Sequence, residues 1–274
     1  MIDAHQHFWQ LSRGDYDWPN ASVAPIFRDF GPEDLAPLLA AAGVRQTVLV
    51  QATPTVAETR YLLQLAARTP FVAAVVGWAD LTAPEAVETI DMLRADPLLR
   101  GLRPMLQSID DTDWILQPAA EAALRHMARV GQRFDALIQP RHLPVIATLA
   151  KRHTDLSIVV DHVAKPRMGA GQVPDAGWLE GISALASLPN VWCKLSGMIT
   201  EIGPDWMPAD LTRHAAHVLQ QFGPARVMWG SDWPVVNLAG DYAGWAAQAR
   251  ALVADGAGQV FDGTARAFYG LGPA

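Results

Sequence analysis

Eight short apolar runs recur along this chain, and a segment with a helical pattern follows each of them. The runs lie near residues 1–8, 46–53, 71–79, 100–106, 134–140, 156–162, 190–196 and 226–232. Such continuous apolar character is typical of strands buried on both faces, as in a parallel sheet. Helices are expected over 32–42, 55–68, 84–95, 118–130, 143–153, 175–187, 209–222, 242–254 and 259–269. This alternation predicts a single α/β domain over residues 1–274, a (β/α)₈ barrel of the TIM type, with an open doubly wound sheet as the alternative.

Composition and charge limit the classes of partner. Half of the residues are hydrophobic and 18% are charged, so a large core can be buried. The formal net charge is −7 and no basic run occurs, so we expect no nucleic-acid partner. No run of about 18 apolar residues predicts a membrane span, and the N-terminal MIDAHQH lacks the pattern of a signal peptide. We therefore expect a cytoplasmic protein with a small-molecule substrate; the oligomeric state stays open.

Two histidines lie at the end of the first apolar run. In barrels of this kind the chemistry sits at the C-terminal ends of the strands, where the loops converge. His5 and His7 are two residues apart, so on an extended strand both imidazoles point to the same face. Two imidazoles side by side in the barrel mouth suit a divalent metal. We interpret them as site residues rather than as a hydrogen-bonded pair in the core.

Two further polar residues end apolar runs. Asp232 follows VMWGS in the eighth run, which closure of the barrel would bring beside the first run. A carboxylate there can bind a metal or take a proton from water. His162 ends the sixth run, IVVDH, and can donate a hydrogen bond to a substrate carbonyl or bind metal. The alternatives are a loop cap for Asp232 and a structural role for His162.

Short motifs spread over nearly the whole chain resemble one known family. They are HQHFW at 5–9, YDWP at 16–19, GLRPM at 101–105, DHVAKP at 161–166, KLSG at 194–197 and WGSDWP at 229–234. Together they resemble the amidohydrolase superfamily, and more narrowly the amidohydrolase-2 branch that contains sugar lactonases and 2-pyrone-4,6-dicarboxylate lactonase. The resemblance implies an amidohydrolase-like barrel with hydrolase activity. The motifs are specific for the branch but not for one substrate.

One departure from the family pattern concerns the metal. Many metal-dependent amidohydrolases place a metal-binding histidine at the end of the fifth strand and a bridging lysine or glutamate on the fourth. This chain has Gln139 and Arg103 there, and a permanently cationic guanidinium cannot bind a metal. A two-metal site is therefore not expected. A single Zn²⁺ could bind to His5, His7 and Asp232 with a water as fourth ligand, and the resemblance leaves open whether it is bound or required.

The resemblance implies hydrolysis of a small lactone, first of all a sugar (aldono-)lactone such as L-fuconolactone or L-rhamnonolactone. Asp232 would act as the general base on the attacking water. The charge on the carbonyl oxygen would be met by donors from Arg103, His162 or Lys194, each typically worth about 3 kcal/mol. For Arg103 and Lys194, pairing with an acidic neighbour is the alternative.

Aromatic residues and one further cation are candidates for substrate contact. Trp9, Trp18 and Trp78 lie at strand ends or in loops, where they can form the wall of a pocket. Indole faces pack well against the C–H faces of a sugar. Arg141 follows the fifth run and, with Lys194, is a candidate cation. Core packing for the tryptophans and a surface position for Arg141 are the alternatives.

Three other functions stay open on these residues. A dicarboxylate lactone hydrolase would need two or more cations around the pocket, which Arg103 with Arg141 or Lys194 can supply. A metal-dependent decarboxylase of the same family would need a tightly held metal. A non-catalytic sugar-binding barrel would bind without turnover. The absence of a Gly-x-Ser-x-Gly elbow argues against a serine hydrolase.

Overall fold

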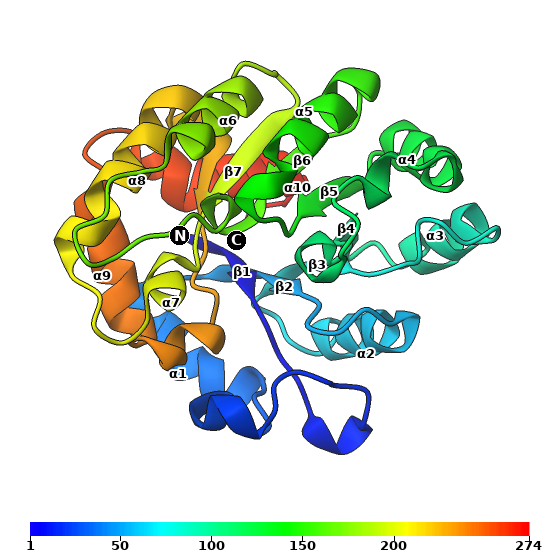
Figure 1. The fold of residues 1–274 in the computed structure, drawn as a ribbon. Helices are drawn as coiled ribbons and strands as arrows, with labels where there is room; N and C mark the ends of the chain where they lie inside the picture. The colour runs from blue at the N-terminus through cyan, green and yellow to red at the C-terminus, as the bar shows by residue number, and fades with distance from the viewer. Residues whose placement is uncertain (274) are drawn as a thin grey trace.

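The computed structural model describes residues 1–273, in which eight parallel strands are surrounded by helices (Figure 1). The strands are β1 (Ile2–Gln6), β2 (Gln46–Val50), β3 (Val72–Gly77), β4 (Leu99–Leu102), β5 (Arg133–Ala136), β6 (Ile158–Val160), β7 (Val191–Leu195) and β8 (Val227–Trp229). Each strand pairs in parallel with the next in chain order. The predicted barrel is confirmed.

The barrel closes between β1 and the segment that follows β8. The backbone N–H of Asp232 donates to the carbonyl of His5 over 2.8 Å, and the N–H of His7 donates to the carbonyl of Trp233 over 2.7 Å. Gln6 and Trp233 form an isolated parallel bridge at the same place. The backbone around the predicted site residues therefore takes part in closing the barrel.

Most of the helices cover the outside of the barrel. The helices are α1 (Pro32–Ala42), α2 (Val56–Ala66), α3 (Ala86–Arg94), α4 (Pro118–Val130), α5 (Leu143–Arg152), α6 (Ala176–Ala186), α7 (Met198–Ile202), α8 (Pro208–Phe222), α9 (Tyr242–Leu252) and α10 (Thr264–Tyr269). Helix α7 lies at the C-terminal mouth of the barrel, and α10 lies at its N-terminal end. Local signals set several starts: Pro32 and Pro118 take the first helical position, and the Thr55 hydroxyl accepts from the backbone N–H of Glu58.

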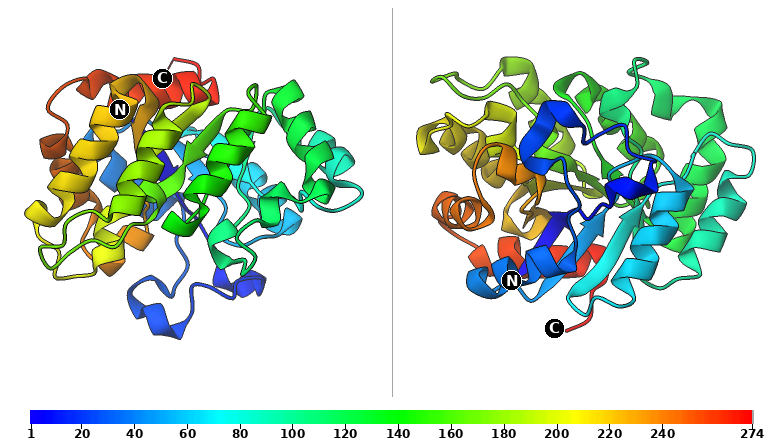
Figure 2. Two further views of the ribbon diagram at one scale, coloured as in Figure 1. Left: turned by 45° about the horizontal axis from the view of Figure 1, so that its top comes forward. Right: turned by 90° about the horizontal axis from the view of Figure 1, so that it is seen from below.

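Side chains fill the inside of the barrel. Inward-facing residues of five strands form one apolar cluster, which includes Ile2, Val48, Val76, Val159 and Met228. Helix α10 closes the N-terminal end of the barrel, where its aromatic side chains join this cluster. Both chain termini lie at that end, at the top of the left view in Figure 2. The opposite end is left for the loops that carry the site.

Residues 9–31 cross the C-terminal end of the barrel, as the dark blue segment in the right view of Figure 2 shows. Trp9 and Phe30 form an antiparallel bridge at the base of this segment. The Trp9 indole N–H donates to the carbonyl of Arg28 over 2.7 Å, and the Trp18 ring packs edge-to-face on Trp9 at 5.8 Å. The segment therefore holds Trp18 over the barrel mouth.

Several element boundaries differ from the prediction. The strands expected over 134–140 and 226–232 are shorter, as β5 and β8. An apolar run indicates which residues are buried, not where the strand ends. Leu137 and Ile138 are buried although they lie beyond the last residue of β5. Residues Gln259–Gly263, expected as regular helix, form a wider π-helical turn before α10. The short helix α7 was not predicted, because five residues are too few for a helical period to show.

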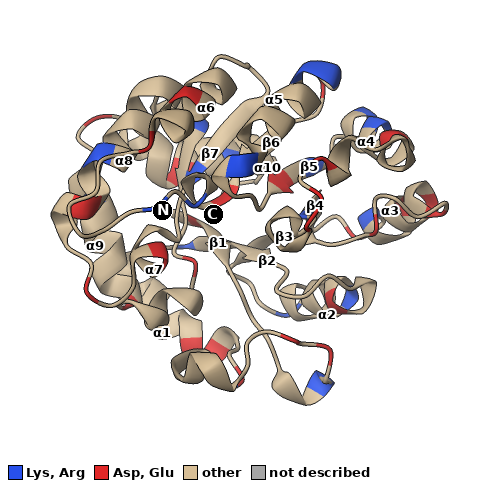
Figure 3. Ribbon diagram, viewed as in Figure 1, with Lys and Arg blue, Asp and Glu red and all other residues tan. Residues whose placement is uncertain are grey.

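Charged residues of both signs are distributed over the outer helices (Figure 3). Among residues 1–273, no helix is long and apolar enough to cross a membrane. The cytoplasmic location stays a prediction.

Candidate active site

His5, His7 and Asp232 meet at the C-terminal end of the barrel. His5 Nε2 lies 3.2 Å from His7 Nε2. Asp232 Oδ1 lies 3.3 Å from His7 Nε2 and 3.7 Å from His5 Nε2. All three residues are buried. The alternation of side chains along β1 brings the two imidazoles together, and closure of the barrel brings the carboxylate to them.

A hydrogen bond to the backbone fixes the orientation of His7. Its Nδ1 lies 2.8 Å from the carbonyl oxygen of Val50, which can only accept. Nδ1 therefore carries a proton, and Nε2 is the ring nitrogen that faces His5 and Asp232. An imidazole that binds a metal usually has such an outer hydrogen bond.

The three side chains fit a divalent metal. Around a tetrahedral Zn²⁺ with ligands at about 2.0–2.1 Å, neighbouring ligand atoms lie roughly 3.3 Å apart. The separations of 3.2, 3.3 and 3.7 Å among His5, His7 and Asp232 are close to that spacing. A second triple, His5, Asp161 and His162, also has donor atoms within 4.8 Å of one another. Both triples share His5, so the donor set is that of one compact site.

His162 lies on a strained turn after β6. The residues from His162 to Lys165 all have φ between 49° and 62°, the left-handed region. Each such non-glycine residue costs about 1 kcal/mol or more, so tertiary contacts must hold the turn. His162 Nδ1 lies 2.9 Å from Ser196 Oγ, and Nε2 lies 3.9 Å from Asp232 Oδ1. Burial lowers the pKa of His162 to about 4, so the ring is neutral at pH 7.

Gly197 gives the His162 ring its space. Gly197 has φ +64°, and a Cβ there would lie 2.5 Å from His162 Nδ1. The residue after Ser196 must therefore be glycine for both reasons, conformation and contact. The KLSG motif pointed to this place in the sequence without indicating its role.

A buried network of charges lies behind the histidines. Lys194 Nζ lies 2.5 Å from Asp135 Oδ2 and 3.0 Å from Asp161 Oδ1. It also lies 3.2 Å from His5 Nδ1. The Tyr269 hydroxyl donates to Asp135 Oδ2 over 2.6 Å, so helix α10 reaches the same network. Burial would raise the pKa of Asp161, but Lys194 and His5 outweigh it and hold that pKa well below its usual range.

The position of Lys194 corrects one expectation. The side chain is fully buried and does not line the cavity described below, so it cannot donate to a substrate carbonyl there. Pairing with acidic neighbours, the alternative, is what the structure has. Asp135 was missed, although a carboxylate inside the apolar run FDALI is a usable signal, because a buried charge needs a partner.

Arg103 is paired and also faces the cavity. Its Nη1 lies 3.3 Å from Asp161 Oδ2, and its Nη2 lies 3.0 Å from Gln51 Oε1 and also donates to the Gln51 carbonyl. Its Nε has no hydrogen-bond partner within residues 1–273, and Arg103 lines the cavity. One N–H of a rigidly held guanidinium is therefore buried without a partner among the described residues, next to the cavity that Arg103 lines.

Asp3 joins β1 to the loop that carries Asp232. Its Oδ1 accepts from the backbone N–H of His5 over 3.2 Å and of Ser231 over 2.8 Å. Its Oδ2 accepts from the Tyr242 hydroxyl over 3.0 Å. Burial raises the pKa of Asp3 to about 6. The role of Asp3 could not be predicted from the sequence, because it depends on contacts between residues more than 200 positions apart.

A cavity of about 410 Å³ opens at this end of the barrel. His7, Arg103, His162 and Asp232 line it. Its apolar walls include the predicted Trp18, together with Met105, Leu137, Val235 and Leu238. The cavity therefore brings candidate catalytic groups to a space of the size of a small ligand.

Three other predicted contacts do not line this cavity. Trp9 is only 1% exposed and packs beneath Trp18 through the contact described above. Trp78 is not among the lining residues. Arg141 hydrogen-bonds to the loop 107–112 and so braces that loop.

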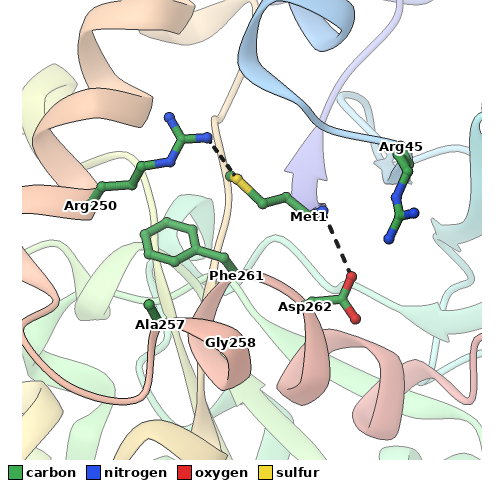
Figure 4. A pocket seen from close by; sticks show the side chains of 7 residues that line it. All are labelled: Met1, Arg45, Arg250, Ala257, Gly258, Phe261 and Asp262. Atoms are coloured by element: carbon green, nitrogen blue, oxygen red, sulfur yellow. Dashed lines mark hydrogen bonds and ion pairs between the residues drawn. The ribbon is translucent and has the colours of Figure 1, made fainter.

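A second cavity, of about 480 Å³, lies where β1 begins (Figure 4). Met1, Arg45, Arg250, Phe261 and Asp262 are among its lining residues. His5, His7, His162 and Asp232 do not contribute to it. We therefore place the candidate active site at the C-terminal mouth, where barrels of this type carry their chemistry.

Comparison with known proteins identifies the family of this chain. The model of the Amidohydro_2 family, described as amidohydrolase, matches residues 2–271. The chain belongs to this family. An L-fucono-1,5-lactonase of Burkholderia ambifaria is 49% identical, over 98% of this chain and 94% of that protein. An L-fucono-1,5-lactonase of Burkholderia multivorans is 38% identical, over 88% and 84%.

Solved structures give the same fold. An amidohydrolase from Burkholderia multivorans, crystallised with bound zinc, superposes with a TM-score of 0.91 and 34% identity over 99% of both chains. A putative 2-pyrone-4,6-dicarboxylic acid hydrolase from Pseudomonas putida gives a TM-score of 0.76 and 26% identity, over 100% of this chain and 98% of that one. The resemblance inferred from the motifs is confirmed.

Proposed function

We propose that this protein hydrolyses a sugar 1,5-lactone, L-fucono-1,5-lactone or a close relative, to the open aldonic acid. The observation that carries the reaction is the meeting of the Asp232 carboxylate with His162 and the Arg103 guanidinium at one cavity. The substrate class is supported by 49% identity, over nearly the full length of both chains, to a protein named L-fucono-1,5-lactonase.

Asp232 acts as the general base. Burial would raise its pKa, but His162, His7 and His5 outweigh it and keep that pKa below its usual value, so the carboxylate is ionised. His162 lowers the pKa of Asp232 only when its own ring is charged, and that ring is neutral at pH 7. At neutral pH His162 therefore does not lower the pKa of Asp232, and the carboxylate is a stronger base than it is in acid. A water next to Asp232 Oδ1 and His7 Nε2 gives its proton to the carboxylate.

Arg103 and His162 stabilise the carbonyl oxygen. Arg103 lines the cavity, and the N–H at its Nε is a donor without a partner within residues 1–273. If the Ser196 hydroxyl donates to His162 Nδ1, the Nε2–H of His162 becomes a second donor. Each donor held in advance at the developing charge is typically worth about 3 kcal/mol.

The bonds and protons of the reaction balance with these residues. The water oxygen forms a bond to the carbonyl carbon while Asp232 takes one water proton. The bond from that carbon to the ring oxygen then breaks, and Asp232 returns the proton to the leaving alkoxide. The product is a hydroxy acid, which ionises at neutral pH.

His5, His7 and Asp232 would hold a divalent metal, which we propose is a single Zn²⁺. When bound, such an ion supplies positive charge that polarises a carbonyl or lowers the pKa of a water. A zinc-bound relative with 34% identity supports the choice of metal.

The arrangement of cations does not favour a dicarboxylate substrate. The cations that line the cavity, Arg103 and Lys165, are paired with Asp161 and Glu201. Lys194, the other predicted cation, lies inside the barrel. A second carboxylate would therefore find no unpaired cation along the cavity wall of residues 1–273.

A substrate panel tests the proposed function. Proton release is followed with L-fucono-1,5-lactone, other aldono-1,5-lactones, 2-pyrone-4,6-dicarboxylate and a dihydroxybenzoate. We expect the sugar lactones to exceed the dicarboxylate by about 100-fold or more in kcat/KM, a difference of about 3 kcal/mol in transition-state binding. Faster dicarboxylate opening, release of CO₂ from the benzoate, or sugar binding without turnover would each replace the proposal with the corresponding alternative.

A further inference from the structure

We propose that the ion pair of Lys165 and Glu201 recognises the ring hydroxyls of the substrate and selects a neutral polyhydroxy lactone over a dicarboxylate. This inference rests on the proposed function and adds its specificity determinant. Lys165 Nζ lies 2.7 Å from Glu201 Oε1, and both residues line the candidate cavity. The side chains are 21% and 27% exposed, so the pair is accessible without being fully solvated.

The ion pair has hydrogen-bonding capacity left for a ligand. An ammonium has three protons and a carboxylate has two oxygens, and the contact between them uses one of each. Within residues 1–273, neither Lys165 nor Glu201 forms a second ion pair. Thr200, next to Glu201, also lines the cavity, and its buried Oγ1 has no partner in the same part of the chain. The ion pair and a residue with an unsatisfied hydroxyl therefore lie together at the cavity.

Neighbouring hydroxyls of a sugar ring match these groups. A hydroxyl both donates and accepts, so one can donate to Glu201 Oε2 while the next accepts from Lys165 Nζ. Hydrogen bonds to charged groups are stronger than neutral ones. A substrate carboxylate would instead meet the negative charge of Glu201 beside a cation that is already paired. The same pair thus attracts one class of lactone and opposes the other.

The backbone ties the ion pair to the catalytic end of the cavity. The N–H of Lys165 donates to the carbonyl of His162 over 2.8 Å. The N–H of Glu201 donates to the carbonyl of Gly197 over 3.2 Å, and Gly197 contacts the His162 ring. The turn after β6 and helix α7 therefore carry both His162 and the pair, which fixes the hydroxyl contacts relative to the reacting carbonyl.

Kinetics with two lactones test the proposal in Glu201→Gln and Lys165→Met. L-Fucono-1,5-lactone carries the hydroxyls, and δ-valerolactone has the same ring size without them. We expect KM for the sugar lactone to rise about 10-fold or more, with kcat changed by less than about 3-fold and no change for δ-valerolactone. Glu121→Gln is the matched control, because it breaks an exposed ion pair with Arg125 on α4. This control variant should leave KM and kcat unchanged for both lactones.

The same variant should act in the opposite direction on a dicarboxylate. Glu201→Gln leaves Lys165 unpaired, so 2-pyrone-4,6-dicarboxylate should bind about 10-fold more tightly than to the parent protein. A pair that serves only to hold two loops together would lower the rates for both lactones equally and would not improve dicarboxylate binding. That result, or an unchanged KM for the sugar lactone, would overturn the proposal.

Calorimetry with 1,5-anhydro-L-fucitol separates this proposal from the proposed function. This ring keeps the hydroxyls but has no carbonyl and cannot be hydrolysed. If the parent protein opens no lactone, the proposed function fails, yet a 10-fold weaker binding of this probe in Glu201→Gln but not in Glu121→Gln still supports the hydroxyl site. Equal binding to all three proteins, or none to the parent, overturns it.

Discussion

At the scale of single residues, the site depends on a lysine that no substrate touches. Lys194 supplies the positive charge between Asp135 and Asp161, and all three are fully buried. Lys194→Met would leave the carboxylates of Asp135 and Asp161 without this positive charge. We expect a loss of about 3–5 kcal/mol in the free energy of unfolding, measured by denaturant titration. The exposed Lys151→Met is the control, and an equally small effect in both variants would contradict this role.

A second buried carboxylate holds the turn after β2. Glu58 accepts from the backbone N–H groups of Ala52 and Thr53 at 2.9–3.1 Å and is fully buried. Burial, the largest effect, raises its pKa from 4.5 to about 7 despite these hydrogen bonds. The folded protein therefore holds a proton on Glu58 in a pH range where the unfolded chain has lost it.

This raised pKa predicts a pH dependence of stability. The contribution of Glu58 is fully present below pH 4.5 and is lost as the pH rises to about 7. The pKa change corresponds to about 3 kcal/mol. The unfolding free energy of the parent minus that of Glu58→Gln should fall by about this amount between pH 4.5 and 7.5. A difference that stays constant with pH would refute the prediction, and the exposed Glu88→Gln provides the baseline.

At the scale of elements, the turns after β6 and β7 act as one unit. Gly197→Ala would put a methyl group 2.5 Å from His162 Nδ1, whereas Gly43→Ala, at a similar φ of +71°, meets no atom within 4 Å. Both changes carry backbone strain, but only the first displaces His162. We expect kcat/KM for the lactone to fall about 100-fold in Gly197→Ala and to stay unchanged in Gly43→Ala. Steady-state kinetics measure both variants. Equal kcat/KM values in Gly197→Ala and Gly43→Ala would argue against a role for the contact between residue 197 and His162.

How much of the site could be predicted also varies by element. The period of two along a strand placed His5 and His7 together, and barrel closure added Asp232. Lys194 was wrongly expected at the cavity, because a sequence shows that a lysine is in a strand but not which carboxylates surround it. Glu201 was not identified, since it stands on a five-residue helix that leaves no periodic pattern.

At the scale of the whole molecule, the apolar alternation was sufficient to predict the barrel and its strand order. It was not sufficient to predict the strand ends, because the apolar runs continue into buried loops such as Leu137–Ile138. The segment 9–31, which covers the mouth, has no periodic pattern of its own. Its course depends on contacts such as the bridge between Trp9 and Phe30.

The chemistry assigned to the chain's own residues predicts how the whole protein responds to metal removal. A lactone is a strained ester, and the base and the carbonyl donors come from side chains. We expect chelated protein, with metal content checked by elemental analysis, to hydrolyse the sugar lactone within about 10-fold of the Zn²⁺-loaded rate. Complete loss that Zn²⁺ restores would show that the metal is required.

The central claim is that Asp232 is the base of a sugar lactonase, and the isosteric Asp232→Asn tests it most directly. The measurement is kcat for L-fucono-1,5-lactone in the parent and the variant, with folding compared by circular dichroism. We predict a fall in kcat of about 10³-fold with little change in KM, because the amide cannot take the water proton. Lactone hydrolysis at the full parental rate in a folded Asp232→Asn protein would contradict the account.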